Sequence, residues 1–179
     1  FAQNFHHQGH KIKQIFSRAK ANAQALAFAV HADSIIEISE MQRNADLYVI
    51  AVSDQAISSL IMDFPIDLSG IVVHCSGATE MDVLHKFKHY GVIYPPQSIS
   101  KNEDSDFSQI PFCIEGNTPK VQATLLTLIH TIAPKSFACS TSQRLAIHVA
   151  SVFANNFTNA LFQISYELLQ KHDLPFDLV

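Results

Sequence analysis

The sequence predicts an α/β fold, a doubly wound parallel sheet followed by an all-α segment. Three short apolar runs end in small, polar or charged residues, and helix-like sequence follows each: 12–18 (IKQIFSR), 45–54 (ADLYVIAVSD) and 71–78 (IVVHCSGA). Parallel strands of such sheets have this pattern at the ends where ligands bind. Residues 141–172 contain no Gly or Pro, which predicts one long helix.

Bulk composition limits the classes of function. The 179 residues suffice for one full domain and part of another. A net charge of -4 argues against a nucleic acid or a membrane surface as partner, and no apolar run is long enough to cross a bilayer. Cys75, Cys113 and Cys139 form no C-x-x-C pair, so we expect reduced thiols in a cytoplasmic protein.

The first residues predict the end of a helix rather than the start of a domain. Phe1 to Gln8 is amphipathic and is followed by Gly9, a helix-stop residue. We therefore expect the first strand of the sheet and its Gly-rich loop to precede Phe1.

The remaining elements follow from apolar runs, caps and breakers. Asp54 can cap the helix that follows it. The expected strands are 11–16, 45–52, 68–75, 91–95 and 111–115, with short extended pieces at 34–38 (or a loop) and 137–139, and the expected helices are 19–30, 55–62, 80–90 and 120–132.

The pattern changes near residues 136–140. Apolar residues recur at helical spacing through the long segment that follows. We expect a dinucleotide-binding α/β domain over 1–138 and the start of a helical, dimerising domain over 139–179.

Ser17 and Arg18 end the expected second strand of a Rossmann order. NAD-binding versions have an acidic residue here, whereas an Arg accommodates the extra phosphate of NADP. A hydroxyl beside a cation suits a phosphate dianion. The alternative is a solvated turn before a helix.

Small residues end the next ligand-facing strand. Ala51, Val52 and Ser53 would let the backbone approach a ribose or nicotinamide closely. Alternatively, Ser53 and Asp54 only cap the following helix.

Ser76 and Gly77 end the expected fifth strand and would line the nicotinamide side of the cleft. Cys75 is expected in the core. A nucleophilic Ser76 is the hydrolase alternative, but the G-x-S-x-G elbow is absent.

Gln97 and Ser98 follow a rigid Pro-Pro pair at the same edge of the sheet. Their side chains could bond a substrate, or they could form a plain edge turn.

His148, Ser151 and Asn155 lie at i, i+3 and i+7 of the long helix and are predicted to share one face. His148 could act as a general acid near neutral pH, and Asn155 could hold a substrate carbonyl or carboxylate. Ser151, between them, is expected to contact the substrate. The alternative is a satisfied polar network in the core.

His6, His7 and His10 cluster near the start. No acidic or Cys partner lies close in sequence, so a solvated helix end is expected rather than a metal site.

The order of these motifs resembles a known family. IFSR, ADLYVIAVSD, HCSG, YPPQS, PFCIEGN and HVASVFANN are similar to segments of Rossmann-like NADP oxidoreductases with a helical C-terminal domain of unassigned function. These proteins are distantly similar to pyrroline-5-carboxylate reductase, ketopantoate reductase and the deazaflavin-dependent NADP oxidoreductases.

The resemblance implies NADP(H) as cofactor, a homodimer through the C-terminal helices and an active cleft between the domains. Ser17 and Arg18 would match the adenosine-phosphate turn, and His148 and Asn155 the inter-domain helix. Related hydroxyacid dehydrogenases carry a catalytic Lys on that helix, and no Lys occupies the stripe here.

Three functions follow as hypotheses. The first is hydride transfer between NADP(H) and a small carbonyl, imine or hydroxy acid. The second, which the absent Lys favours, is a non-catalytic NADP(H)-binding sensor or dimeric interaction module. The third is a structural dimer without a cofactor.

Overall fold

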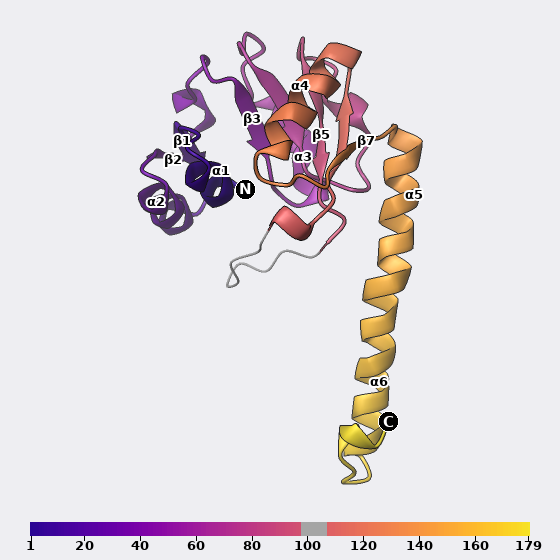
Figure 1. Ribbon diagram of the computed structural model, residues 1–179. Coiled ribbons are helices and arrows are strands. Elements are labelled where there is room, and N and C mark those ends of the chain that lie inside the picture. The colour runs from indigo at the N-terminus through magenta and orange to yellow at the C-terminus, as the bar shows by residue number, and fades with distance from the viewer. Residues whose placement is uncertain (98–106) are drawn as a thin grey trace.

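Helices and strands alternate through most of the chain in the computed structural model, which describes residues 1–97 and 107–179 (Figure 1). The strands are β1 Gln14–Phe16, β2 Asp33–Ile35, β3 Leu47–Ile50, β4 Ile71–His74, β5 Tyr90–Tyr94, β6 Cys113–Gly116 and β7 Phe137–Ala138. The α-helices are α1 Ala2–His7, α2 Lys20–Ala29, α3 Asp54–Met62, α4 Pro119–His130, α5 Thr141–Ser151 and α6 Thr158–Gln170.

The strands form two sheets. β1 and β2 pair in parallel, and a second sheet has the order β3-β4-β5-β6-β7. β3, β4 and β5 are parallel, as predicted, but β6 runs antiparallel to β5. The α4 crossover keeps β7 parallel to β6, whereas the described part of the β5–β6 connection contains only a 3-10 turn, Phe107–Gln109, and no α-helix.

Side-chain hydrogen bonds, rather than paired strands, connect the smaller sheet to the loop that precedes β3. The Lys13 ammonium donates to the Asn44 carbonyl at 2.7 Å, and the Gln14 amide donates to the Glu40 carbonyl at 3.0 Å. Gln14 also accepts from the Gln42 backbone N–H at 2.7 Å. The loop before β3 is thereby fixed against β1.

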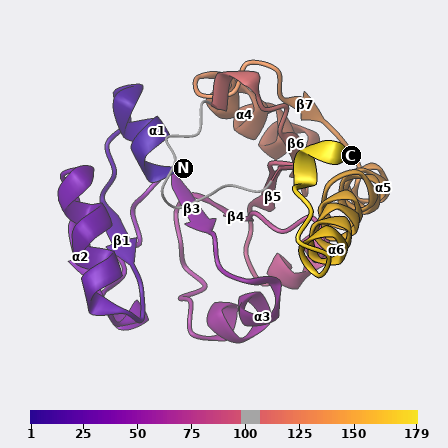
Figure 2. The same cartoon turned by 90° about the horizontal axis from the view of Figure 1, so that it is seen from below.

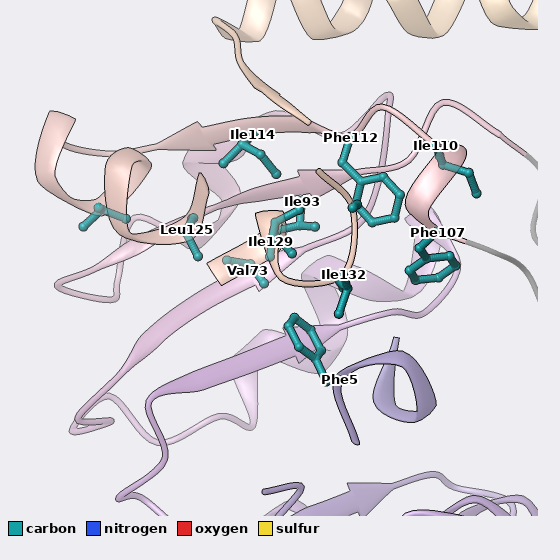
Figure 3. Close-up of a cluster of buried hydrophobic side chains, with 12 residues drawn as sticks. Phe5, Val73, Ile93, Phe107, Ile110, Phe112, Ile114, Leu125, Ile129 and Ile132 are labelled. Atoms are coloured by element: carbon teal, nitrogen blue, oxygen red, sulfur yellow. The ribbon is translucent and has the colours of Figure 1, made fainter. Parts of the chain in front are cut away.

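Helices cover both faces of the larger sheet. Val73 of β4 packs with α4 and α1 on one face (Figure 3), whereas its neighbour Val72 packs with α3 on the other, as strand alternation requires. Figure 2 shows α1 and α4 on one side of this sheet and α3 on the opposite side.

The expected helix over 80–90 is a single 3-10 turn, Met81–Leu84. Leu84 and Phe87 are both buried in the core beside α3. Phe87 lies just beyond this turn, where its backbone N–H donates to the Leu84 carbonyl at 3.0 Å, so burial of this pair does not require an α-helix. The expected Asp54 cap is also wrong, because Ser53 is the N-cap of α3 and no side chain bonds there.

The long helix is confirmed. Ser140 and Gln143 form a capping box at its start, and α5 continues through a π-helical segment, Val152–Phe157, into α6. It extends well away from the α/β part (Figure 1). No helix in the described ranges is both long and apolar enough to cross a membrane.

Candidate active site

Three residues from distant parts of the sequence meet where β4 ends. The Tyr94 hydroxyl, at the end of β5, lies 3.1 Å from His148 Nδ1 on α5. A Cβ atom added to Gly77 would lie 2.6 Å from Tyr94 Cζ and closer still to His148 Nδ1. Only glycine leaves room for this contact, so Gly77 allows the long helix to approach the carboxyl edge of the sheet.

A buried ion pair fixes α5 in this place. The Arg144 guanidinium, which is fully buried, contacts the Glu115 carboxylate of β6. It also donates to the carbonyl oxygens of Ser76, at 3.2 Å, and Gly77, at 2.6 Å. The Thr141 hydroxyl donates to the second Glu115 oxygen at 2.7 Å. Both charges therefore have partners, although Arg144 Nη2 makes no hydrogen bond to the described residues. These contacts attach α5 to β6 and to the turn after β4, one turn before His148.

Tyr94, Arg144 and Glu115 were missed in the sequence. A signal existed for Arg144, because it lies four residues before His148 and so shares the predicted polar stripe of the long helix. No such signal marks Tyr94, whose role depends on a contact across 54 residues.

Ser76 is held by its own turn. Its hydroxyl oxygen accepts from the backbone N–H groups of Ala78 and Thr79, at 3.2 and 2.9 Å, and the residue is buried. The nearby His74 Nδ1 accepts the Ser76 backbone N–H rather than the hydroxyl. Within the described residues no base contacts this oxygen, so the geometry gives no support to a nucleophilic serine.

His74 is a neutral residue inside the fold. Burial, followed by the charge of Arg144, lowers the pKa of His74 to about 4. Its Nε2 is buried and makes no hydrogen bond to the described residues.

Ser17 and Arg18 directly follow β1, which belongs to the smaller sheet. Arg18 is exposed and makes no hydrogen bond or ion pair with the described part of the chain, while the Ser17 hydroxyl accepts from the Ala19 N–H at 3.2 Å. The turn thus presents a free cation at a strand end. In the described residues, β1 pairs with β2 and not with the larger sheet, in which β4 precedes Gly77.

Ala51, Val52 and Ser53 follow β3 and are all exposed. Val52 keeps 39% of its surface accessible, so the end of this strand is open to solvent. Since β3 and β4 are parallel neighbours, these residues and Gly77 lie at the same edge of the sheet.

The polar stripe of the long helix is only partly preserved. His148 and Ser151 are both half-buried, one turn apart. Asn155 is exposed within the π-helical segment, where the wider turn moves it away from the seven-residue repeat of a regular α-helix. Gln97 is exposed beyond the end of β5, and Ser98 lies outside the described residues.

The remaining candidate groups have ordinary surroundings. The three cysteines are unpaired, and burial raises the pKa of Cys75 to about 12, so it remains a thiol. His6 packs against His31 edge to face, and His10 bonds Thr131. No cluster of three or more metal-ligating side chains occurs in 1–97 or 107–179.

Family comparisons agree with this architecture. A Rossmann-like domain family matches residues 1–98, and a domain of unknown function, DUF2520, matches residues 110–179. No curated protein matches the chain significantly.

Several solved structures are similar to this chain in sequence or fold. Putative NADP oxidoreductase BF3122 from Bacteroides fragilis is 32% identical, with a TM-score of 0.84 over 99% of this chain and 70% of that one. Protein TM1727 from Thermotoga maritima is 24% identical (TM-score 0.72; 96% and 67% covered). An imine reductase from Myxococcus stipitatus, in complex with NADP+, shares the fold at 11% identity (TM-score 0.76; 98% and 63% covered).

The matching segments carry both halves of the site, Gly77 in the α/β part and His148 on the long helix. The chain therefore belongs to the family of Rossmann-like proteins whose C-terminal part is the DUF2520 domain.

Proposed function

We propose that this protein binds NADP(H) at the carboxyl ends of β1, β3 and β4 and is an oxidoreductase acting on a small carbonyl, imine or hydroxy acid. The contact of His148 with Gly77 carries the proposal, because it places a proton-donating side chain at the strand end where a Rossmann fold binds nicotinamide. The name of the Bacteroides fragilis relative supports the same class of reaction.

The residues present fit this cofactor. Arg18 offers an unpaired cation for the 2′-phosphate, and Ser17 a neighbouring hydroxyl. Ala51, Val52 and Ser53 leave the end of β3 open to a ribose or nicotinamide. When bound, the nicotinamide ring supplies or accepts the hydride.

The protein's own groups would bind and orient the substrate. His148 serves the reacting oxygen or nitrogen as hydrogen-bond partner, and Ser151 lies on the same side of α5 one turn on. Asn155 and Gln97, both exposed, are the proposed contacts to the distal part of the substrate.

We also propose a homodimer formed through the long helix. Val149, Phe153, Phe157, Leu161, Ile164 and Leu168 recur every three or four residues, and each keeps more than half of its surface accessible. The chain exposes 10967 Å², against roughly 8,700 Å² for a compact protein of its mass. An apolar stripe of this length in water favours a second copy.

The three unpaired cysteines favour a reducing compartment such as the cytoplasm. Imaging of the tagged full-length protein in its own cells tests this location.

Calorimetric titration of the full-length protein with NADPH and NADH tests cofactor binding. We expect preference for NADPH, and Arg18→Glu should reduce NADPH affinity at least tenfold with little effect on NADH. Lys120→Glu, an equal charge reversal at the start of α4, is the control. Equal losses for both cofactors would remove Arg18 from the site, and no binding of either would reject the proposal.

Turnover separates an enzyme from a sensor. NADPH oxidation with a panel of cyclic imines and 2-oxo acids should proceed in the wild type. Tight NADPH binding without any turnover would favour the non-catalytic binding module.

A further inference from the structure

The two nitrogens of His148 have different surroundings. Nδ1 faces the Tyr94 hydroxyl at 3.1 Å and the backbone of Gly77. Nε2 makes no hydrogen bond to the described part of the chain. The imidazole is therefore held on its Nδ1 side, which leaves Nε2 as the nitrogen available to a ligand.

The positions of two hydrogens follow from this contact. Among the described residues, His148 Nδ1 is the acceptor available to the Tyr94 hydroxyl. Either atom of this pair can donate, depending on the tautomer of His148. Burial, followed by the neighbouring Cys113 thiol, raises the pKa of Tyr94, so the phenol keeps a proton that it can donate to Nδ1. A neutral imidazole that accepts at Nδ1 carries its hydrogen on Nε2.

We propose that Tyr94 is a positioning residue that holds the His148 imidazole by Nδ1 with a hydrogen on Nε2, ready to donate a hydrogen bond to the carbonyl oxygen or imine nitrogen of a substrate being reduced. This inference rests on the proposed function and narrows its substrate class. A hydroxy acid undergoing oxidation requires a nitrogen lone pair at the same place, to accept its hydroxyl proton. A fixed N–H donor instead stabilises the negative charge that develops on the oxygen or nitrogen, which receives its proton from solvent water after NADPH has supplied the hydride to carbon.

Several charged or titratable groups act on this pair. Arg144 lies one turn before His148 on α5, and Cys113 and Asp54 act on Tyr94 from β6 and α3. Glu115 is engaged by Arg144. Removing the Tyr94 hydroxyl leaves all four in place, so Tyr94→Phe tests the hydrogen bond itself.

Nitrogen NMR reads the tautomer directly and needs no substrate. In 15N-histidine protein at about pH 8, where an ordinary histidine is neutral, His148 should show an unprotonated Nδ1 and a protonated Nε2. The signals that vanish in His148→Gln assign it. Tyr94→Phe should produce a mixture of tautomers, whereas Tyr90→Phe, which removes a hydroxyl from the other end of β5, should not. A wild-type hydrogen on Nδ1, or no change in Tyr94→Phe, would overturn the proposal.

Binding and turnover are measured on the same variants. Tyr94→Phe should bind NADPH within about twofold of wild type, while kcat for imine or 2-oxo acid reduction falls at least tenfold. His148→Gln retains an amide N–H donor and should keep more activity than His148→Leu. Equal loss in the two His148 variants would contradict the donor role. Absence of NADPH binding in the wild type would reject the proposed function without altering the tautomer result.

Discussion

The Arg144 guanidinium and the Gly77 carbonyl oxygen are joined by a 2.6 Å hydrogen bond between the start of the long helix and the end of a central strand. The donor is fully buried and charged, and its other partners are the Glu115 carboxylate and the Ser76 carbonyl oxygen. Hydrogen bonds from a buried charge are stronger than neutral ones and are costly to leave incomplete. This bond fixes how closely α5 approaches the ligand-binding edge.

Replacing Arg144 by Met should destabilise the protein by about 3–5 kcal/mol, because Glu115 would stay buried without its partner. Urea unfolding measures the change. Arg43→Met breaks the exposed Arg43–Asp67 pair and should cost far less, because solvent screens both charges. Similar losses in the two variants would show that burial does not strengthen the Arg144 contact.

Gly77→Ala should displace the Tyr94–His148 pair, because the added methyl group overlaps both side chains. We expect a stability loss of about 1–3 kcal/mol and an altered His148 resonance in NMR spectra. Gly9→Ala is the control: its φ of 83° strains a side chain by about 1–2 kcal/mol, but nothing lies within 4 Å. An unchanged His148 signal in Gly77→Ala would contradict the close contact.

Stability should fall as the pH drops from about 6.5 towards 4, because unfolded His74 takes up a proton that the folded residue, with its pKa of about 4, does not. The stabilising contribution is fully present above the unfolded pKa, and by pH 4 about 3 kcal/mol of it is lost. His74→Asn keeps an acceptor for the Ser76 N–H and does not titrate, so its unfolding free energy should vary less with pH. His7→Asn, on the exposed end of α1, should follow the wild type.

Phe157→Glu should convert a dimer to a monomer, because it places a charge in the middle of the apolar stripe where Phe153 and Phe157 stack at 5.0 Å. Light scattering after size exclusion gives the mass. Asn159→Glu, roughly opposite on the helix, should leave the mass unchanged. A monomeric wild type at tens of micromolar would reject the dimer.

Patterns confined to one element could be predicted from the sequence. The strand ends around Ser53 and Gly77 and the uninterrupted helix after Ser140 depend on local periodicity and on breakers, and the structure contains them. The family resemblance reached the same architecture, which the matched domains confirm.

Features that depend on contacts between distant elements could not be predicted. The reversed direction of β6 is decided by a connection without a predicted helix, and local hydrophobicity does not encode strand direction. The Tyr94–His148 contact and the Arg144–Glu115 pair join residues 54 and 29 positions apart. Asn155 was placed on a seven-residue repeat, but the π-helical segment disrupts that repeat.

The position of the long helix is set by contacts near its start. At 1.5 Å per residue, Thr141 to Gln170 extends about 45 Å, and its side-chain bonds to the sheet come from its first turns, through Thr141, Arg144 and His148. A small rotation of the helix about these contacts therefore moves its far end through a larger distance. The direction in which the apolar stripe from Val149 to Leu168 faces is therefore set by the same few contacts that enclose Gly77.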